Sequence, residues 1–296
     1  MSASIRIIGV PMDLGQSRRG VDMGPAALRY GDLVRKLERL GCRIDDAGNV
    51  EVPVRDTLPP EGGLAFLPAV VRTCEAVYQI GRQTIDAGDV PLYLGGDHSI
   101  ALGTVAAAAE GQRTGLLWID AHGDFNTPDT SPSGNLHGMP LAALTGRGIG
   151  ELTDLVRPGP RVREEDVVMV GVRDLDPRER EALRDSDVTV FTMADIDRWG
   201  IGRVAERAME KLSGLPRVHV SLDMDALDPR EAPGVGTPVA GGLTYREAHL
   251  LMEIAADSLE VDSIDVVEIN PILDDRNRTS ELAIELILSA LGKAIL

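Results

Sequence analysis

The chain has 296 residues, 43% of them hydrophobic and 26% charged, as in an ordinary globular protein. Its formal net charge of -17 argues against nucleic acid as a partner, because phosphate binding relies on a basic surface. No window approaches the roughly 20 apolar residues of a membrane span, and the N-terminal apolar run is too short for a signal peptide. Cys42 and Cys74 are not needed as a cross-link in a chain of this size. We therefore expect a cytoplasmic protein with reduced thiols and no membrane partner.

Short β-branched runs alternate with longer helical patterns along the chain, which is typical of parallel βαβ units. The expected elements, in chain order, are a strand at 4–10, a helix at 24–40, a strand at 42–47, a helix at 67–87, a strand at 91–95, a helix at 99–109, strands at 115–120, 166–172 and 188–192, a helix at 197–212, a strand at 218–224, a helix at 245–258, a strand at 263–269 and a helix at 280–294. Thr244 and Glu247 predict a capping box before the helix at 245–258.

No linker or repeat interrupts this series, so we expect one domain over residues 1–296. The pattern alone leaves open whether the eight strands close into a barrel or form an open, doubly wound sheet. In both architectures a ligand is expected at the carboxyl ends of the strands.

Acidic and imidazole side chains follow four of the predicted strands at that position. The motif GGDHS stands at 95–99, DAHGD at 120–124 and DMD at 223–225, and Glu268 lies at the end of the last strand. Because side chains two apart in a strand point the same way, the alternating residues of DAHGD are predicted to share one face, and so are those of DMD.

Several carboxylates at the mouth of a hydrophobic sheet repel one another and lose hydration, unless a multivalent cation lies between them. The candidate ligands are four carboxylates and two imidazoles with no thiolate, namely Asp120, Asp124, Asp223, Asp225, His98 and His122. Mn²⁺ suits this mixture, and six ligands exceed the need of one ion with an open position, so the residues predict two ions. Taken singly, a DxH motif is equally compatible with a turn or a surface pair, and GGDHS with a turn and a helix N-cap at Asp97 or Ser99.

GGDHS, DAHGD and SLDMDALDP (221–229) resemble the signature motifs of the ureohydrolase superfamily, dimanganese enzymes that release urea from guanidino groups. Further segments are similar to those of bacterial arginases and extend the resemblance over nearly the whole chain: IIGVPMDLGQSRRGVDMGPAALRY, NTPDTSPSGNLHGMP, GVRDLDPRE, APGVGTPVAGGLTYRE and VVEINPILDDRN. The resemblance implies a three-layer αβα fold of the arginase/deacetylase type, with an open, mostly parallel eight-stranded sheet. It also implies a homotrimer or homohexamer.

The resemblance further implies two Mn²⁺ ions per chain and a hydroxide bridging them, which attacks the guanidinium carbon of L-arginine to give L-ornithine and urea. One ion would be held by His98, Asp120, Asp124 and Asp223. The other would be held by Asp120, His122, Asp223 and Asp225, so that Asp120 and Asp223 are the bridging ligands.

The resemblance also carries roles for residues around the ions. Glu268 would pair with the guanidinium group, supported by Thr237, while Asp124 would carry a proton to the leaving nitrogen and His137 would exchange protons with solvent. The α-carboxylate and α-amino groups of the substrate would be bound by Asn126, Ser131 and Ser133 on one side and by Asp176, backed by Glu179, on the other. His219 and His249 lie outside every motif and are expected to pack in the interior or lie at the surface.

Three other functions are alternatives to arginine hydrolysis. An agmatinase or guanidino-acid hydrolase would use the same metals, but agmatine has no carboxylate to occupy the loop at Asn126, Ser131 and Ser133. A two-metal phosphoesterase would need a phosphate-binding cation, which the strand-end motifs lack. A catalytically silent metal-binding homologue would not need His137 and Glu268.

Overall fold

The computed structural model describes residues 4–58, 64 and 66–293. The strands found there are β1 (Ser4–Gly9), β2 (Arg43–Asn49), β3 (Val90–Leu94), β4 (Thr114–Ile119), β5 (Val167–Val172), β6 (Thr189–Thr192), β7 (Arg217–Asp223) and β8 (Val261–Val267). The helices found there are α1 (Gly24–Tyr30), α2 (Leu33–Arg39), α3 (Leu67–Asp86), α4 (Ala101–Ala108), α5 (Pro140–Leu144), α6 (Gly150–Thr153), α7 (Pro177–Arg184), α8 (Met193–Trp199), α9 (Ile201–Leu212), α10 (Tyr245–Ser258) and α11 (Arg278–Ala290).

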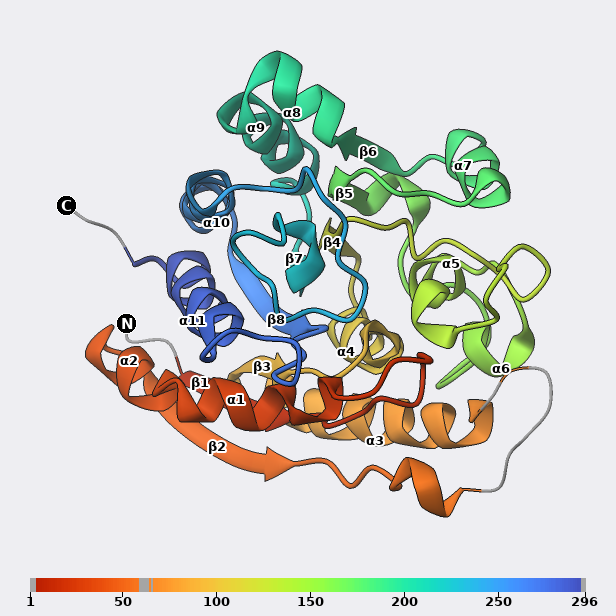
Figure 1. The fold of residues 1–296 in the computed structure, drawn as a ribbon, viewed down its shortest axis with the longest axis horizontal. Coiled ribbons are helices and arrows are strands. Elements are labelled where there is room, and N and C mark those ends of the chain that lie inside the picture. Colours follow the sequence, from red (N-terminus) through yellow and green to blue (C-terminus); the bar gives the residue numbers. More distant parts are fainter. Residues whose placement is uncertain (1–3, 59–63, 65, 294–296) are drawn as a thin grey trace.

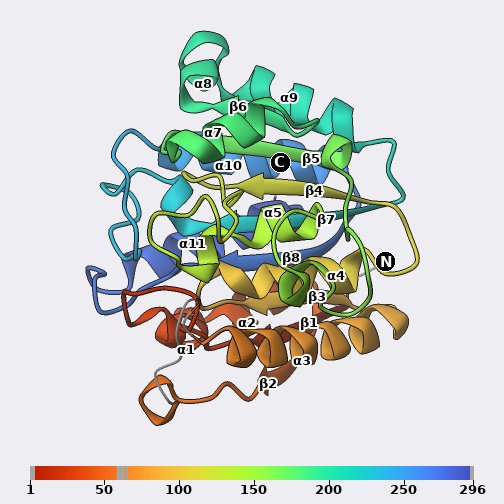
Figure 2. The ribbon, with the colours of Figure 1, turned by 90° about the vertical axis from the view of Figure 1, so that its right-hand side faces the viewer.

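The described strands form one eight-stranded sheet in which all paired neighbours run parallel. Helices α1, α2, α8, α9, α10 and α11 pack together as one layer, and α3, α4, α5 and α6 as another, with the sheet between them (Figures 1 and 2). This confirms the predicted open sheet of an α/β fold and excludes the barrel.

Each face of the sheet has its own hydrophobic core, because successive side chains of a strand point to opposite faces. In β4, Leu117 and Ile119 pack under the layer that contains α9 and α10, whereas Leu116 and Trp118 pack under the layer that contains α4. All four side chains are at most 1% exposed. A strand buried on both faces reads as a continuous apolar run, which is why the sequence pattern of β4 was easy to recognise.

The strand order is β2-β1-β3-β8-β7-β4-β5-β6. The four strands that the polar motifs follow, β3, β8, β7 and β4, are therefore direct neighbours in the middle of the sheet. Parallel pairing brings their carboxyl ends to one edge, so four segments far apart in the sequence meet there.

Two predicted helices are each divided. The helix expected at 24–40 ends after Tyr30 and restarts at Leu33, because Asp32 adopts a left-handed conformation with φ 69°. The helix expected at 197–212 is the end of α8 followed by α9, and Gly200 between them has φ 77°, which glycine adopts without steric cost. Helices α5, α6 and α7 were not predicted, and Ala294, the expected end of the last helix, lies outside the described residues.

Within the described part of the chain, no helix is both long and apolar enough to cross a bilayer. Cys42 and Cys74 are both free thiols, and burial raises the pKa of each.

Candidate metal centre and adjoining pocket

The first group of candidate ligands surrounds the imidazole of His98. Its Nδ1 atom lies 3.1 Å from Asp120 Oδ2, 3.0 Å from Asp124 Oδ2 and 3.2 Å from Asp223 Oδ2. All four residues are at most 6% exposed. The ring of His98 also stacks on Trp118 of β4, with centroids 4.0 Å apart and planes within 10°, so its orientation is fixed.

The second group lies beside the first and shares Asp120 with it. His122 Nδ1 is 3.0 Å from Asp225 Oδ2 and 3.5 Å from Asp120 Oδ1. Ligand atoms of Asp120, His122 and Asp225 lie within 4.8 Å of one another, as do those of His98, Asp120 and Asp223. The structure therefore brings the six predicted ligands together as two adjoining groups.

The backbone reaches this arrangement by turns rather than by the extended pleat that we expected. β4 ends at Ile119, and Asp120 Oδ1 accepts the backbone N–H of His122 at 2.6 Å. β7 ends at Asp223, whose Oδ1 accepts the backbone N–H of Asp225 at 2.7 Å. In each case the aspartate carboxylate accepts the backbone N–H two residues later, and this hydrogen bond forms a turn. These residues thus converge through turns, and not through the alternation of an extended strand that the sequence predicted.

Burial and mutual repulsion leave these carboxylates under electrostatic strain. Burial first, and then the charge of Asp120, raise the pKa of Asp124 to about 6. Burial and the charges of Asp225 and Asp120 also raise the pKa of Asp223 well above its usual value. Burial alone would lower the pKa of His98, but the carboxylates of Asp120, Asp124 and Asp223 raise it well above its usual value. A cation between these groups would relieve the repulsion.

The residues present fit a divalent ion of the Mn²⁺ type. His98 Nδ1 is buried and has no hydrogen-bond partner among the described residues, even though three carboxylate oxygens lie within 3.2 Å of it. Three oxygens around one nitrogen at this distance, none in hydrogen-bond geometry, match side chains that point at a common centre. Oxygen donors with a minority of imidazole nitrogen and no thiolate favour Mn²⁺ over a structural zinc site.

Glu268 closes the edge of the sheet next to this cluster. It follows β8 directly, adopts φ 64° and is fully buried. Its Oε1 accepts the backbone N–H of His98 at 3.0 Å and lies 2.9 Å from His137 Nδ1, and its Oε2 accepts Gln16 Nε2 at 2.7 Å. Burial opposes ionisation, but the His137 and Gln16 contacts hold the pKa of Glu268 below its usual value. We did not single out Gln16 from the sequence, although it lies in a segment that carries the resemblance.

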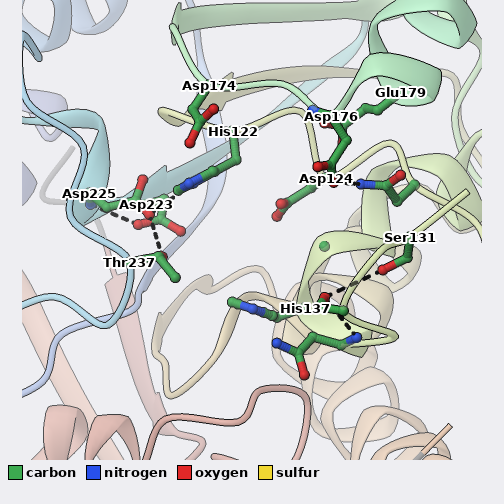
Figure 3. A pocket seen from close by; sticks show the side chains of 14 residues that line it. His122, Asp124, Ser131, His137, Asp174, Asp176, Glu179, Asp223, Asp225 and Thr237 are labelled. Carbon is green, nitrogen blue, oxygen red and sulfur yellow. Dashed lines mark hydrogen bonds and ion pairs between the residues drawn. The ribbon is translucent and has the colours of Figure 1, made fainter.

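An open cavity of about 140 Å³ lies over the cluster (Figure 3). One wall contains His122, Asp124, Asp223 and Asp225, and His137 lines another side. The far end is lined by the residues predicted to recognise an amino acid, Asn126, Ser131, Ser133, Asp176 and Glu179. The lining also includes Asn135 and, beside His122 (Figure 3), Asp174. The sequence stretches NLHG and GVRDLDPRE contain these last two residues, but we assigned no role to either.

Hydrogen bonds order the far end of the cavity. Asn126 Nδ2 donates to Asp176 Oδ2 at 2.9 Å. Asp176 precedes α7, and the buried Glu179 accepts the backbone N–H groups of Phe125 at 2.9 Å and Asp176 at 3.2 Å. Burial raises the pKa of Glu179 to about 7. Glu179 therefore ties the loop after β4 to the start of α7.

Thr237 lies on the cavity wall, but its contact differs from the expected one. Its hydroxyl donates to Asp225 Oδ2 at 2.9 Å rather than to Glu268. The preceding Gly236 is the residue next to Glu268: a Cβ atom on Gly236 would come within 3.4 Å of Glu268 Oε2. Thr237 thus supports the carboxylate of Asp225, and the expected support of Glu268 is not seen.

Comparison with known proteins places this arrangement in a family. The model of the Arginase family matches residues 3–292. The chain is 47% identical to the arginase of Bacillus subtilis, with 100% of both chains covered. Its fold superposes on the native structure of Bacillus caldovelox arginase with a TM-score of 0.96, at 48% identity and with 100% of both chains covered. It is also similar to Entamoeba histolytica arginase in complex with L-ornithine, with a TM-score of 0.91 at 30% identity, covering 99% of this chain and 100% of the other. The chain therefore belongs to the arginase family.

Proposed function

We propose that this protein hydrolyses L-arginine to L-ornithine and urea, using two Mn²⁺ ions held by the two ligand groups around Asp120. One ion would be held by His98, Asp120, Asp124 and Asp223, and the other by Asp120, His122, Asp223 and Asp225. The observation that carries the proposal is the cavity itself. Carboxylates and imidazoles line one side of it, and a loop suited to an amino-acid head group lines the other.

The far end of the cavity supports arginine over other guanidines. Asn126, Ser131 and Ser133 offer amide and hydroxyl groups that suit a carboxylate, and Asp176 offers a carboxylate that suits an ammonium group. The relatives named arginase and the relative solved with L-ornithine agree with an amino acid at this end. A substrate that lacks either charged group would leave the polar side chains at this end of the cavity without a charged partner.

When bound, a pair of Mn²⁺ ions supplies Lewis acidity that lowers the pKa of a water molecule towards neutrality. The protein side chains do the remaining work. Glu268 would orient the guanidinium group through a charge-assisted contact. A carboxylate has about four acceptor positions, and three on Glu268 are taken by His98, His137 and Gln16. A bidentate contact with the guanidinium group therefore requires His137 to release Oε1.

Two residues are suited to move protons. Asp124 lines the cavity, and its Oδ2 lies 3.0 Å from His98 Nδ1. Asp124 would therefore carry a proton to the leaving nitrogen of ornithine. The imidazole of His137 is 15% exposed and also lines the cavity, so it would exchange protons between the cavity and bulk water. Burial opposes protonation of His137, but the charge of Glu268 raises its pKa to about 9. A guanidinium group bound to Glu268 would replace protonated His137 as the cationic partner of this carboxylate. It would therefore favour loss of the proton from His137.

The test is urea release from three guanidines by the full chain reconstituted with Mn²⁺. L-Arginine has both head groups, agmatine lacks the carboxylate and 4-guanidinobutyrate lacks the amino group, so each analogue tests one end of the cavity. A lost hydrogen bond to a charged group costs about 1.5–3 kcal/mol, so we expect kcat/KM to fall at least about tenfold for each analogue. A preference for agmatine or guanidinobutyrate would instead identify a different ureohydrolase. No urea release with Mn²⁺ bound would indicate a silent homologue.

We also propose a domain organisation, a cellular location and an oligomeric state. We propose a single domain over residues 1–296, since all described strands belong to one sheet. The free cysteines and the bacterial relatives support a cytoplasmic location. The family resemblance supports a homotrimer or homohexamer, which light scattering on the purified protein would distinguish.

A further inference from the structure

A chain of buried polar side chains runs from the metal cluster into the interior of the sheet. His98 Nε2, on the side of the ring away from the carboxylates, is 2.8 Å from Ser221 Oγ. Ser221 Oγ donates to Asp265 Oδ1 at 2.6 Å, and Asp265 Oδ2 is 2.9 Å from His219 Nε2 and also accepts the hydroxyl of Thr104. Each of these residues is fully buried. None of them lines the cavity, and the reaction described above uses only His98, as a metal ligand.

The sheet itself fixes this chain in place. Ser221 of β7 is the direct partner of Asp265 on β8, and His219 is the direct partner of Ser263. Cross-strand partners on adjacent parallel strands point to the same face, so the side chains lie in contact without any loop between them. The network is therefore part of the rigid centre of the sheet.

The hydrogen bonds determine which nitrogen of His98 carries the proton. An ionised carboxylate can only accept hydrogen bonds, so the single hydroxyl hydrogen of Ser221 points to Asp265. Ser221 Oγ must then accept from His98, which places the hydrogen of the neutral imidazole on Nε2. The lone pair of Nδ1 is left pointing at Asp120, Asp124 and Asp223. A metal ligand needs this tautomer.

Three hydrogen-bond donors surround the carboxylate of Asp265 and favour its ionised form. Ser221, His219 and Thr104 all point hydrogen-bonding groups at its carboxylate, and a protonated acid would have to give up one of these contacts. His219 satisfies its other nitrogen with Ser263 Oγ at 2.7 Å, so a neutral His219 can donate to Asp265 and accept from Ser263. One buried negative charge therefore stands behind His98, two hydrogen bonds away.

We propose that Ser221 and Asp265 are positioning residues, which fix His98 as the Nε2–H tautomer and so set the metal affinity of the site formed by His98, Asp120, Asp124 and Asp223. The inference rests on the proposed function, because it takes His98 to be a metal ligand. It goes further in assigning two residues that touch neither metal nor substrate. The site around His122 shares Asp120 and Asp223 with this site but does not use His98 as a ligand, so its affinity is expected to change less.

The test compares two serine-to-alanine variants from the same network. Ser221→Ala removes the hydroxyl next to His98, whereas Ser263→Ala removes an equally buried hydroxyl whose hydrogen-bond partner among the described residues is His219. Mn²⁺ is titrated into the metal-free full chain, and unbound Mn²⁺ is followed by electron paramagnetic resonance. Loss of an outer partner of a histidine ligand typically costs about 10–100-fold in metal affinity, so Ser221→Ala should weaken one of the two sites by that factor. Ser263→Ala should leave both sites within about twofold of the wild type, since it leaves the first two hydrogen bonds intact.

Asp265→Asn and the tautomer itself give independent readouts. Asp265→Asn keeps the size of the side chain and removes its charge, so it should weaken the same site as Ser221→Ala. With ¹⁵N-labelled histidine and diamagnetic Zn²⁺, the Nε2–H of His98 should be a slowly exchanging signal in the wild type and in Ser263→Ala, and a rapidly exchanging one in Ser221→Ala. Ser263→Ala controls for a general loss of stability, which would move both readouts in that variant as well.

The outcomes separate this inference from the proposed function. If Ser221→Ala and Ser263→Ala weaken Mn²⁺ binding equally, or if neither does, the positioning role is wrong. If Ser221→Ala has no effect while His98→Ala abolishes one site, the positioning role fails but the ligand assignment stands. If His98→Ala retains both sites at wild-type affinity, the ligand assignment itself fails, and the inference with it.

Discussion

Asp225 has the simplest test among the candidate ligands, because its side chain joins His122 and Thr237. Its Oδ2 lies 3.0 Å from His122 Nδ1 and accepts the hydroxyl of Thr237 at 2.9 Å. We expect Asp225→Ala to bind fewer Mn²⁺ ions per chain by elemental analysis and to lose at least about 100-fold in urea production, because loss of a ligand exceeds the effect of losing an outer partner. Asp257→Ala, which removes an exposed aspartate of α10, is the matched control. Full metal content in Asp225→Ala would contradict the assignment.

His137 should behave in the opposite way. It lies at the cavity but contacts Glu268 rather than the ligand groups, so His137→Ala should keep its Mn²⁺. Turnover should fall about 10²–10⁴-fold, the usual contribution of a proton-transfer residue. Added imidazole should restore part of the rate, since the substitution leaves space for a small base. Undiminished turnover of the variant across neutral pH would show that His137 moves no proton in the limiting step.

At the level of single residues, the sequence was informative where a motif followed a strand. The six candidate ligands were found because acidic residues and histidines interrupt an apolar pattern, and such an interruption needs a reason. Gln16 and Asn135 carry no charge and stand in loops without periodicity, so nothing local distinguishes them from ordinary loop residues. Their positions beside Glu268 and the cavity depend on contacts between distant segments, which the sequence pattern does not contain.

At the level of elements, capping and left-handed residues explain helix ends and breaks that hydrophobic periodicity does not predict. The helix α10 begins at Tyr245 as predicted, because Thr244 and Glu247 form the expected capping box. The breaks at Asp32 and Gly200 occur inside otherwise helical patterns, and they depend on left-handed residues that periodicity does not register. Helices α5 and α6 have five and four residues, too few for a repeating pattern.

The contact between α10 and α11 provides a prediction on pH. His249 of α10 is 7% exposed, and its Nδ1 lies 2.9 Å from Ser289 Oγ of α11. Burial lowers its pKa below 6.5, and the surrounding charges, Glu253, Arg246, Glu285 and Lys293, are of both signs. A histidine with a lowered pKa contributes stability that is present above pH 6.5 and is lost as the pH falls through the folded-state pKa.

His249→Gln removes this titrating group. We expect the free energy of unfolding in urea to fall more steeply between about pH 8 and about pH 5.5 in the wild type than in the variant. Comparing the two slopes cancels the packing lost with the ring, because that loss is the same at both pH values. Parallel slopes would mean that His249 is equally easy to protonate in the folded and unfolded chains.

At the level of the whole molecule, the position of the site depends on the order of the strands. The alternation of strands and helices predicted a parallel sheet, and the motifs predicted that polar groups gather at its carboxyl edge. The order that makes β3, β8, β7 and β4 neighbours was not predictable, since β8 is last in the chain yet inserts between β3 and β7. Crossover connections specify a right-handed path but not the strand beside which the chain returns.

This arrangement also predicts that Mn²⁺ stabilises the whole fold. The candidate ligands follow three of the four central strands, and an ion held there joins segments that the unfolded chain keeps far apart. A ligand that binds only the folded state at 100 times its Kd adds about 2.7 kcal/mol for each site. Chelation of the metal should therefore lower the free energy of unfolding by a similar amount for each site occupied.

The net charge of -17 introduces a second effect that must be separated from the first. Any cation screens repulsion between surface carboxylates and so stabilises a highly acidic protein without a specific site. Screening acts equally on the wild type and on Asp225→Ala, because one carboxylate is a small part of the total charge. Site binding acts on the wild type far more than on the variant. Urea unfolding of both proteins in Mn²⁺, and in NaCl of equal ionic strength, distinguishes the two effects. Equal stabilisation of both proteins by Mn²⁺ would mean that the ion acts through the surface, and that the carboxylate cluster is not what holds it.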